Sequence, residues 1–137
     1  APWLCAQRVF EDQPLAKVRL TALVLRTLEL HGDGKIASLT ISSEMFAASG
    51  ADQELTEGLV NFARSVEGVE AAVLVRETPT PGTCKVSLRS RGTVDVAATS
   101  MKFGGGGHSA AAGATVKGSL ADIKARVVSA LLDQIRA

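Results

Sequence analysis

Apolar residues recur at helical spacing in the first 30 residues of the chain, on two stripes. These stripes comprise Leu20, Val24 and Leu28, and Val18, Ala22 and Leu25. Residues three or four apart share a helix face, so the pattern predicts a helix from about Trp3 to Leu30 that is covered on two sides. Pro14 suits a first helical turn and begins or kinks this helix. The glycines of the segment 31–34 end it, because glycine is common just past a helix C-terminus.

The middle of the chain passes from a strand pattern to helix patterns. Apolar and polar residues alternate over residues 35–42, which predicts a strand with one buried face. Ser42 or Ser43 suits the cap of a short helix through Ala48, and Asp52 suits the cap of a longer one. The inner stripe of that longer helix consists of Leu55, Leu59, Phe62 and Val66.

A hairpin pattern follows. The apolar run 69–75 predicts a buried strand, and the proline-glycine turn 78–82 joins it to an alternating strand that begins near Cys84. If that strand persists far enough, its polar face carries Lys85, Arg89 and Arg91. The positive side chains of this region therefore gather on one face.

The C-terminal third adds two helices and one strand. Residues 94–101 predict a short helix, Val116 ends a last strand, and Ser119 with Asp122 caps an amphipathic C-terminal helix. Its inner stripe consists of Leu120, Ile123, Val127, Leu131 and Ile135. Together these elements predict an α+β fold in which a mixed β-sheet of about five strands is flanked by helices.

Composition narrows the class of protein. With 137 residues and 46% hydrophobic content, the chain suits one compact domain, and its net charge of +1 argues against a polybasic or an acidic disordered protein. The segment from Lys85 to His108 nevertheless carries a net charge of +3. Cys5 and Cys84 show neither zinc spacing nor a disulfide pattern, and no apolar stretch approaches the ~20 residues that span a bilayer. We expect a cytoplasmic protein, and the start at Ala1 rather than Met suggests a fragment or processed product.

The run Gly104, Gly105, Gly106, Gly107 is the most informative local feature. Glycines bury no side chain and lose much backbone entropy on ordering, so packing does not explain four of them. A glycine loop that enters a short helix at His108 would direct N–H groups at an anion, and Arg89 and Arg91 would add charge-assisted contacts. The segment predicts a phosphate site. The alternative is a flexible loop or tight turn beside solvated arginines.

Catalytic and metal-binding patterns are absent from the sequence. His108 suits a phosphate donor, a base-stacking group or a proton acceptor, although a loop-filling histidine is the commoner use. No second histidine, cysteine pair or carboxylate cluster accompanies it as metal ligands. The chain also has no Ser/His/Asp set, no Walker loop and no aromatic-studded basic strand. We predict no catalytic and no metal-ligating residues in this chain.

Three segments carry a family resemblance. They are Ser87-Leu88-Arg89-Ser90-Arg91, Val94-Asp95-Val96-Ala97 and the glycine-histidine-alanine run 104–113. Together they resemble the C-terminal DHH-associated domain of DHH-family phosphoesterases, and the likeness extends upstream through 56–61 and 68–77. The chain is most similar to the branch of nanoRNA-degrading oligoribonucleases and pAp phosphatases, of mycobacterial or actinobacterial type, which also act on cyclic di-AMP or its linear product.

The resemblance implies a division of labour. In this family an N-terminal domain holds two manganese ions through Asp and His motifs that include Asp-His-His, while the C-terminal domain grips the substrate. This chain has no Asp-His-His and only two histidines. We therefore expect it to bind substrate without hydrolysing it. Residues 1–30 would form a helical segment that follows the interdomain linker, and residues 31–137 the DHH-associated substrate-binding domain.

Carried over residue by residue, the resemblance assigns a substrate phosphate or nucleotide to a small set of residues. They are Arg89, Gly105, Gly106, Gly107 and His108, with Gly104, Ser90 and Arg91 beside them. The expected partners are short oligonucleotides or nucleotide phosphates, the N-terminal DHH domain of the parent protein and a second copy in a homodimer, with no membrane. Closure on the metal domain would set substrate length. NanoRNA, pAp and cyclic di-AMP products are alternative substrates.

Two other functions fit parts of the pattern. One is an RNA-binding module similar to the C-terminal domain of alanyl-tRNA synthetases, which would bind tRNA-sized ligands with a steep salt dependence. The other is a structural dimerisation domain, suggested by the apolar first helix. It predicts a stable dimer without nucleotide affinity.

Overall fold

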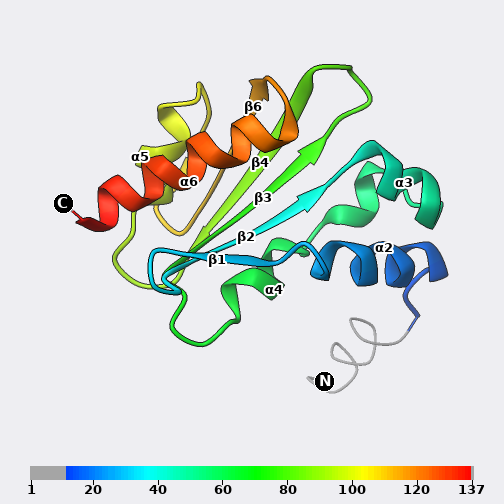
Figure 1. The fold of residues 1–137 in the computed structure, drawn as a ribbon, viewed down its shortest axis with the longest axis horizontal. Coiled ribbons are helices and arrows are strands. Elements are labelled where there is room, and N and C mark those ends of the chain that lie inside the picture. Colours follow the sequence, from blue (N-terminus) through cyan, green and yellow to red (C-terminus); the bar gives the residue numbers. More distant parts are fainter. Residues whose placement is uncertain (1–11, 137) are drawn as a thin grey trace.

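The computed structural model describes residues 12–136, which form one six-stranded sheet with helices on both faces (Figure 1). The strand order is β1-β2-β3-β4-β6-β5. The strands are β1 (Glu29–His31), β2 (Ile36–Ile41), β3 (Ala71–Glu77), β4 (Thr83–Ser90), β5 (Gly106–His108) and β6 (Ala111–Lys117). Only β2 and β3 run parallel, and the other neighbours are antiparallel. The predicted mixed sheet is confirmed, with one strand more than the five expected.

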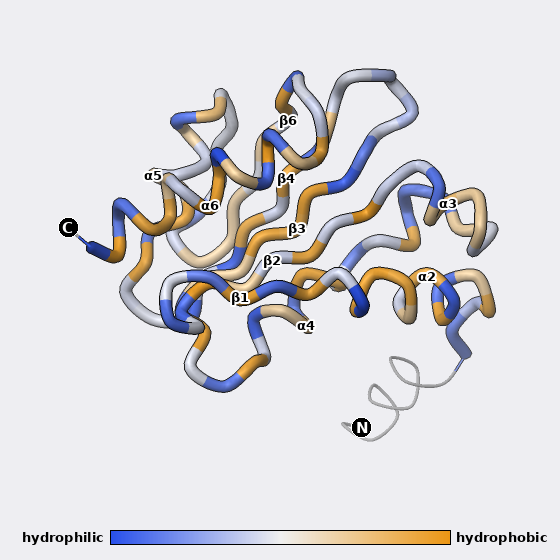
Figure 2. The backbone as a smooth tube through the Cα atoms, in the orientation of Figure 1, coloured by the Kyte–Doolittle hydropathy of each residue, from blue (hydrophilic) through white to orange (hydrophobic). Residues whose placement is uncertain are grey.

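Helices divide between the two faces of this sheet. They are α2 (Leu15–Leu25), α3 (Ser43–Ser49), a 3-10 turn η1 (Gln53–Thr56), α4 (Val60–Arg64), α5 (Val96–Met101) and α6 (Leu120–Arg136). Helices α5 and α6 cover one face, and α2, α3 and α4 pack on the other. Side chains alternate along a strand, so β3 gives Val73 to the first core cluster and Leu74 to the second. The central strands are hydrophobic along most of their length (Figure 2).

The N-terminal helix is shorter than predicted. It begins after Pro14, as expected, but it ends at Leu25, and residues 29–31 form the edge strand β1. The segment His31-Gly32-Asp33-Gly34 is a hairpin turn rather than a helix stop, with positive φ at Gly32, Asp33 and Gly34. The predicted start near Trp3 lies outside the described residues.

The sequence predicted one buried face for β2, whereas both of its faces are buried. Ser38 is fully buried, and its hydroxyl lies 2.8 Å from Nε2 of His31. The strand is internal and runs parallel to β3, so helices cover both of its sides. The hydroxyl of Ser38 therefore has a hydrogen-bond partner inside the protein, and its presence does not mean that this face of the strand contacts solvent.

The helix predicted after Asp52 is interrupted. Asp52 caps η1, accepting a 3.1 Å hydrogen bond from Glu54 N, but the chain turns at Gly58, where φ is +84°, before α4 begins. Phe62 is 47% exposed and does not belong to the inner stripe. The caps at Ser42 and Ser119 are confirmed, each with a side-chain oxygen that accepts from a backbone N–H three residues on.

Candidate functional site

One face of the sheet is accessible to solvent over much of β4, β5 and β6. On β4 and β6 the residues that face α5 and α6 are buried, whereas the alternate residues are exposed or half-buried. We call this second set the open face. It comprises Thr83, Lys85, Ser87 and Arg89 of β4, Ala111, Gly113, Thr115 and Lys117 of β6, and Gly106 and His108 of β5. The predicted basic, polar face of β4 is therefore present and accessible.

Arg89 and His108 flank Ala111 on the open face. Arg89 aligns with Ala111 across β4 and β6, and Ala111 aligns with His108 across β6 and β5. Aligned residues point to the same side of a sheet, and two strand spacings separate the outer pair by about 10 Å. Arg89 is half-buried, and one of its guanidinium nitrogens donates a 2.8 Å hydrogen bond to Leu88 O. The row presents a cation and an imidazole on either side of a single methyl group.

The neighbouring row has almost no side chains. Ser87 aligns with Gly113, and Gly113 aligns with Gly106. Only the Ser87 side chain rises from this row, so a flat group can approach the backbone of β6 and β5 closely. The open face therefore combines a floor of small residues with donors at its margin. An anionic group next to a planar ring fits this combination.

Packing accounts for two of the four glycines, contrary to the prediction from sequence. A Cβ at Gly105 would overlap Gly113 O and Ser100 Oγ, and one at Gly107 would overlap the backbone at Ala111 and Ala112. Gly107 also has φ +133°. The chain lies so close to β6 that a side chain does not fit. The contacting residues lie only four to nine positions away, but they meet these glycines because the chain folds back so that β5 pairs with β6, and no residue pattern reports this pairing.

The other two glycines differ from these and from each other. Gly104 has φ +80° and its N–H donates to Met101 O at 3.2 Å, so it makes the turn that leaves α5. Gly106 has no positive φ, and a Cβ there would meet nothing within 4 Å. Neither conformation nor packing requires a glycine at position 106. A ligand that approaches the backbone there is a remaining reason for it.

The sequence was interpreted as a loop that enters a short helix at His108, but the structure has no helix there. His108 ends the edge strand β5 and is exposed, so no helix N-terminus lies behind it. The glycines allow a tight strand rather than a helix entry. Any anion at this site is therefore attracted by Arg89, His108 and strand-edge N–H groups, and not by a helix dipole.

Ser90 and Arg91 lie away from the row of Arg89 and His108. Ser90 follows Arg89 on β4 and points to the opposite, covered face, where its hydroxyl is buried without a hydrogen-bond partner among the described residues. Arg91 lies beyond β4 and donates to the carbonyls of Arg64 and Val66 at 3.1 and 3.3 Å. Its guanidinium holds the C-terminal end of α4. The structure thus brings Arg89, Gly106 and His108 together without Ser90.

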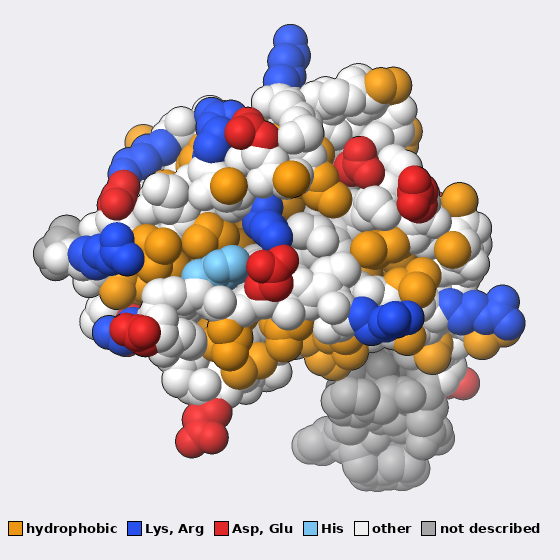
Figure 3. All heavy atoms as spheres, in the orientation of Figure 1, with side chains coloured by type: hydrophobic (Ala, Val, Ile, Leu, Met, Phe, Trp, Pro, Cys, Tyr) orange, Lys and Arg blue, Asp and Glu red, His pale blue; other side chains and the backbone are white. Residues whose placement is uncertain are grey.

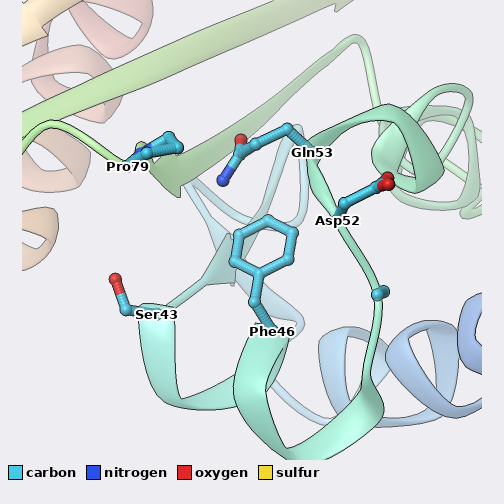
Figure 4. A pocket seen from close by; sticks show the side chains of 6 residues that line it. Ser43, Phe46, Asp52, Gln53 and Pro79 are labelled. Atoms are coloured by element: carbon cyan, nitrogen blue, oxygen red, sulfur yellow. The ribbon is translucent and has the colours of Figure 1, made fainter.

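A separate hollow of about 290 Å³ lies at the opposite end of the sheet (Figure 4). It is lined by Ser43, Phe46, Ala51, Asp52, Gln53 and Pro79. The Gln53 amide is already engaged, because its nitrogen donates to Glu77 O at 3.1 Å and its oxygen accepts from Arg76 at 3.2 Å. Burial lowers the pKa of Arg76. These groups stabilise the end of β3, and none of the site residues predicted from sequence lies here.

Sequence reasoning missed Ser100 and Gly113. Ser100 is fully buried, and its hydroxyl donates a 2.6 Å hydrogen bond to Gly113 O. Residues 111–114 are all Ala or Gly, so no alternation in the sequence marks Ala111 and Gly113 as accessible positions. Within residues 12–136 no group of three His, Cys, Asp or Glu side chains could hold a metal ion, and no helix there is long and apolar enough to cross a membrane.

Comparisons with known proteins agree with this architecture. The bifunctional oligoribonuclease and PAP phosphatase NrnA of Thermus thermophilus is 35% identical over 124 residues, which are 90% of this chain and 36% of that protein. An exopolyphosphatase-related protein from Bacteroides fragilis has a similar structure, with a TM-score of 0.83 and 25% identity over 93% of this chain and 37% of that one. The pGpG-specific phosphodiesterase PggH of Vibrio cholerae shares the fold, with a TM-score of 0.55 and 14% identity over 88% of this chain and 39% of that one.

The chain thus spans little more than a third of each of these relatives. The family model for the DHHA1 domain matches residues 33–137, which include β2 to β6, the glycine run and α6. The resemblance seen in the sequence is therefore confirmed at the level of the family. This chain belongs to the DHHA1 domain family of DHH phosphoesterases.

Proposed function

We propose that this domain binds the phosphate end of very short nucleotides, as the substrate-recognition part of a phosphoesterase that degrades nanoRNA, pAp or the linear product of cyclic di-AMP. The observation that carries the proposal is the row Arg89, Ala111, His108 on the open face. Arg89 supplies a planar, permanently charged donor, and phosphate oxygens accept such donors in pairs. His108 adds a second polar group across the methyl of Ala111.

The floor beside this row supports a nucleotide rather than a bare phosphate. Gly113 and Gly106 leave the backbone uncovered next to Ser87, so a base or ribose can lie flat on the strands. The Thermus thermophilus relative carries oligoribonuclease and PAP phosphatase in its name, and both activities concern short phosphorylated nucleotides. The open face carries three Lys or Arg side chains, Lys85, Arg89 and Lys117, which is little positive charge for binding a long nucleic acid.

Hydrolysis is assigned to a partner domain. The described residues hold no cluster that fits a metal ion, so the two manganese ions implied by the family resemblance do not fit this part of the chain. We propose that an N-terminal DHH domain of the parent protein holds them and that the two domains close on the substrate. The role of this chain is then to bind and orient the phosphate end, which limits the length of nucleotide that reaches the other domain.

Calorimetric titration of the 137-residue chain with pAp and with pApA tests the proposal. Arg89→Ala is expected to weaken binding about tenfold or more, because a hydrogen bond to a charged group contributes ~1.5–3 kcal/mol. His108→Ala should also weaken it. Lys85→Ala is the matched control, since Lys85 is a cation on the same face of β4 but four residues from the row. It should change affinity less than threefold.

Other results would contradict the proposal. An equal loss in Arg89→Ala and Lys85→Ala would mean that the face attracts anions only by its charge. Binding of tRNA-sized RNA with a steep salt dependence, and none of pAp, would favour the RNA-binding module. Absence of any binding by the unmodified chain would mean that this domain does not recognise nucleotides by itself.

A further inference from the structure

Helix α2 has two apolar faces, of which the sheet covers one. Leu20 and Val24 are fully buried in the core cluster that includes β2 and β3. On the opposite side of the helix, Leu15 is 62% exposed, Val18 53% and Leu25 39%, and Ala22 is also exposed. Of the two sides of α2 that were predicted to be covered, the described residues therefore cover one. We call Leu15, Val18, Ala22 and Leu25 the α2 stripe.

The spacing of the α2 stripe indicates a packing surface. Its intervals of three, four and three residues place the four side chains in one row along the helix. Scattered exposed apolar residues are normal, but a continuous row marks a surface that is covered in the assembled protein. Figure 3 shows hydrophobic side chains along the lower edge of the molecule over α2, beside Lys and Arg side chains.

Charge indicates what covers the stripe. Helix α2 contains Lys17 and Arg19 and no acidic residue, and Arg26 follows it as the C-cap. Lys17 donates to Glu57 O at 3.1 Å, whereas neither arginine forms an ion pair within residues 12–136. Arg19 and Arg26 lie along one margin of the stripe at helical spacing. Two copies packed through α2 would place arginine margins side by side, so the charge favours a partner with carboxylates around an apolar patch.

The position of α2 in the chain indicates where that partner is. The DHHA1 match begins at residue 33, so α2 lies outside the family domain although it packs on it. Nearly two thirds of each of two relatives lie beyond the region that matches this chain. We infer that the α2 stripe is the docking face for the other domain of the parent protein, which presents an apolar patch rimmed by Asp or Glu. The inference rests on the proposed function, in which this domain works with a second one.

Thiol protection tests the inference. Val18→Cys is made in the 137-residue chain and in the full-length parent, both with Cys5→Ser, and maleimide labelling is followed by mass spectrometry. Ala125→Cys, on the exposed side of α6, is the control. Val18→Cys should label at least tenfold more slowly in the parent than in the chain, and the control equally in both. Leu25→Cys should behave like Val18→Cys, and the pair Arg19→Glu and Arg26→Glu should restore labelling in the parent.

The outcomes separate the possible failures. Equal labelling of Val18→Cys in both proteins would overturn the inference and leave the proposed function intact. Protection that rises with concentration of the 137-residue chain alone would assign the stripe to a second copy and also overturn it. A parent without any further domain would contradict the proposed function itself.

Discussion

The hydroxyl of Ser100 donates a 2.6 Å hydrogen bond to the carbonyl of Gly113, across the space that a side chain at position 105 would fill. Gly105 N–H donates in turn to Ser100 O at 3.0 Å. The glycine run is thereby fixed against β6 before any ligand arrives. Because the site is ordered before binding, less of the binding free energy is lost in ordering it.

Two adjacent glycine substitutions separate packing from ligand binding. Gly105→Ala should lower the free energy of unfolding by about 2–3 kcal/mol, because the new methyl overlaps Gly113 O and Ser100 Oγ. Gly106→Ala should change it by less than about 0.5 kcal/mol, since nothing lies within 4 Å of a Cβ there. Urea denaturation measures both. Gly106→Ala should nevertheless weaken pAp binding, and unchanged affinity would remove Gly106 from the site.

Replacement of Arg91 should affect stability more than binding. Its guanidinium donates to Arg64 O and Val66 O, two carbonyls at the end of α4. Arg91→Ala should lower the free energy of unfolding by up to about 1 kcal/mol. The affinity for pAp should change less than threefold. A loss of affinity as large as that of Arg89→Ala would place Arg91 on the ligand.

Ser90→Ala should be neutral or stabilising. The hydroxyl is buried without a partner among residues 12–136, and removal of such a group relieves a desolvation cost. The melting temperature should stay the same or rise, with pAp affinity unchanged. If the variant bound pAp more weakly, the side chain would have to reach the open face, contrary to its position opposite Ala71.

His31 should make stability fall as the pH drops from 7 to 5. Burial lowers the pKa of His31 below its ordinary value of 6.5, Glu29 opposes this shift, and Lys124 adds to it slightly. As the pH falls below about 6.5, His31 takes up a proton more readily in the unfolded chain than in the folded chain. The stability that is present above this pH is therefore progressively lost below it. The pKa of Glu29 is lowered by its hydrogen bond to Lys124, so that carboxylate titrates below this range. Denaturation at pH 7, 6 and 5 should show a smaller slope in His31→Gln, and an equal slope would exclude His31 as the cause.

Elements with a local signal were predicted from the sequence. Alternation from Cys84 to Arg89 predicted β4 and its polar face, and the stripe from Leu120 to Ile135 predicted α6. Both patterns reflect one buried and one accessible face, which depends on period alone. The prediction that Arg89 belongs to the site came from that alternation together with the family motif.

The remaining features depend on how nearby segments of the chain fold back and pair, which residue patterns do not report. Leu30 extends the leucine-rich segment from which the first helix was predicted, but residues 29–31 pair with β2 as an edge strand, because the turn at Gly32 reverses the chain. His108 was assigned to a helix start because the glycines before it resembled an anion loop, whereas pairing with Ala111 makes it a strand residue. The need for Gly105 arises from Ser100 and Gly113, and no local pattern reports it.

Titration of the ¹⁵N-labelled chain with pAp, followed by two-dimensional NMR, tests the central claim most directly. The account predicts saturable shifts of the backbone amides of Gly106, His108, Ala111 and Arg89, with none at Phe46 or Gln53 in the separate hollow. In Arg89→Ala these shifts should need about tenfold or more pAp to reach saturation. Saturable shifts centred on Gln53 or on α2, or no saturable shift at all, would contradict the claim that the open face binds nucleotide phosphates.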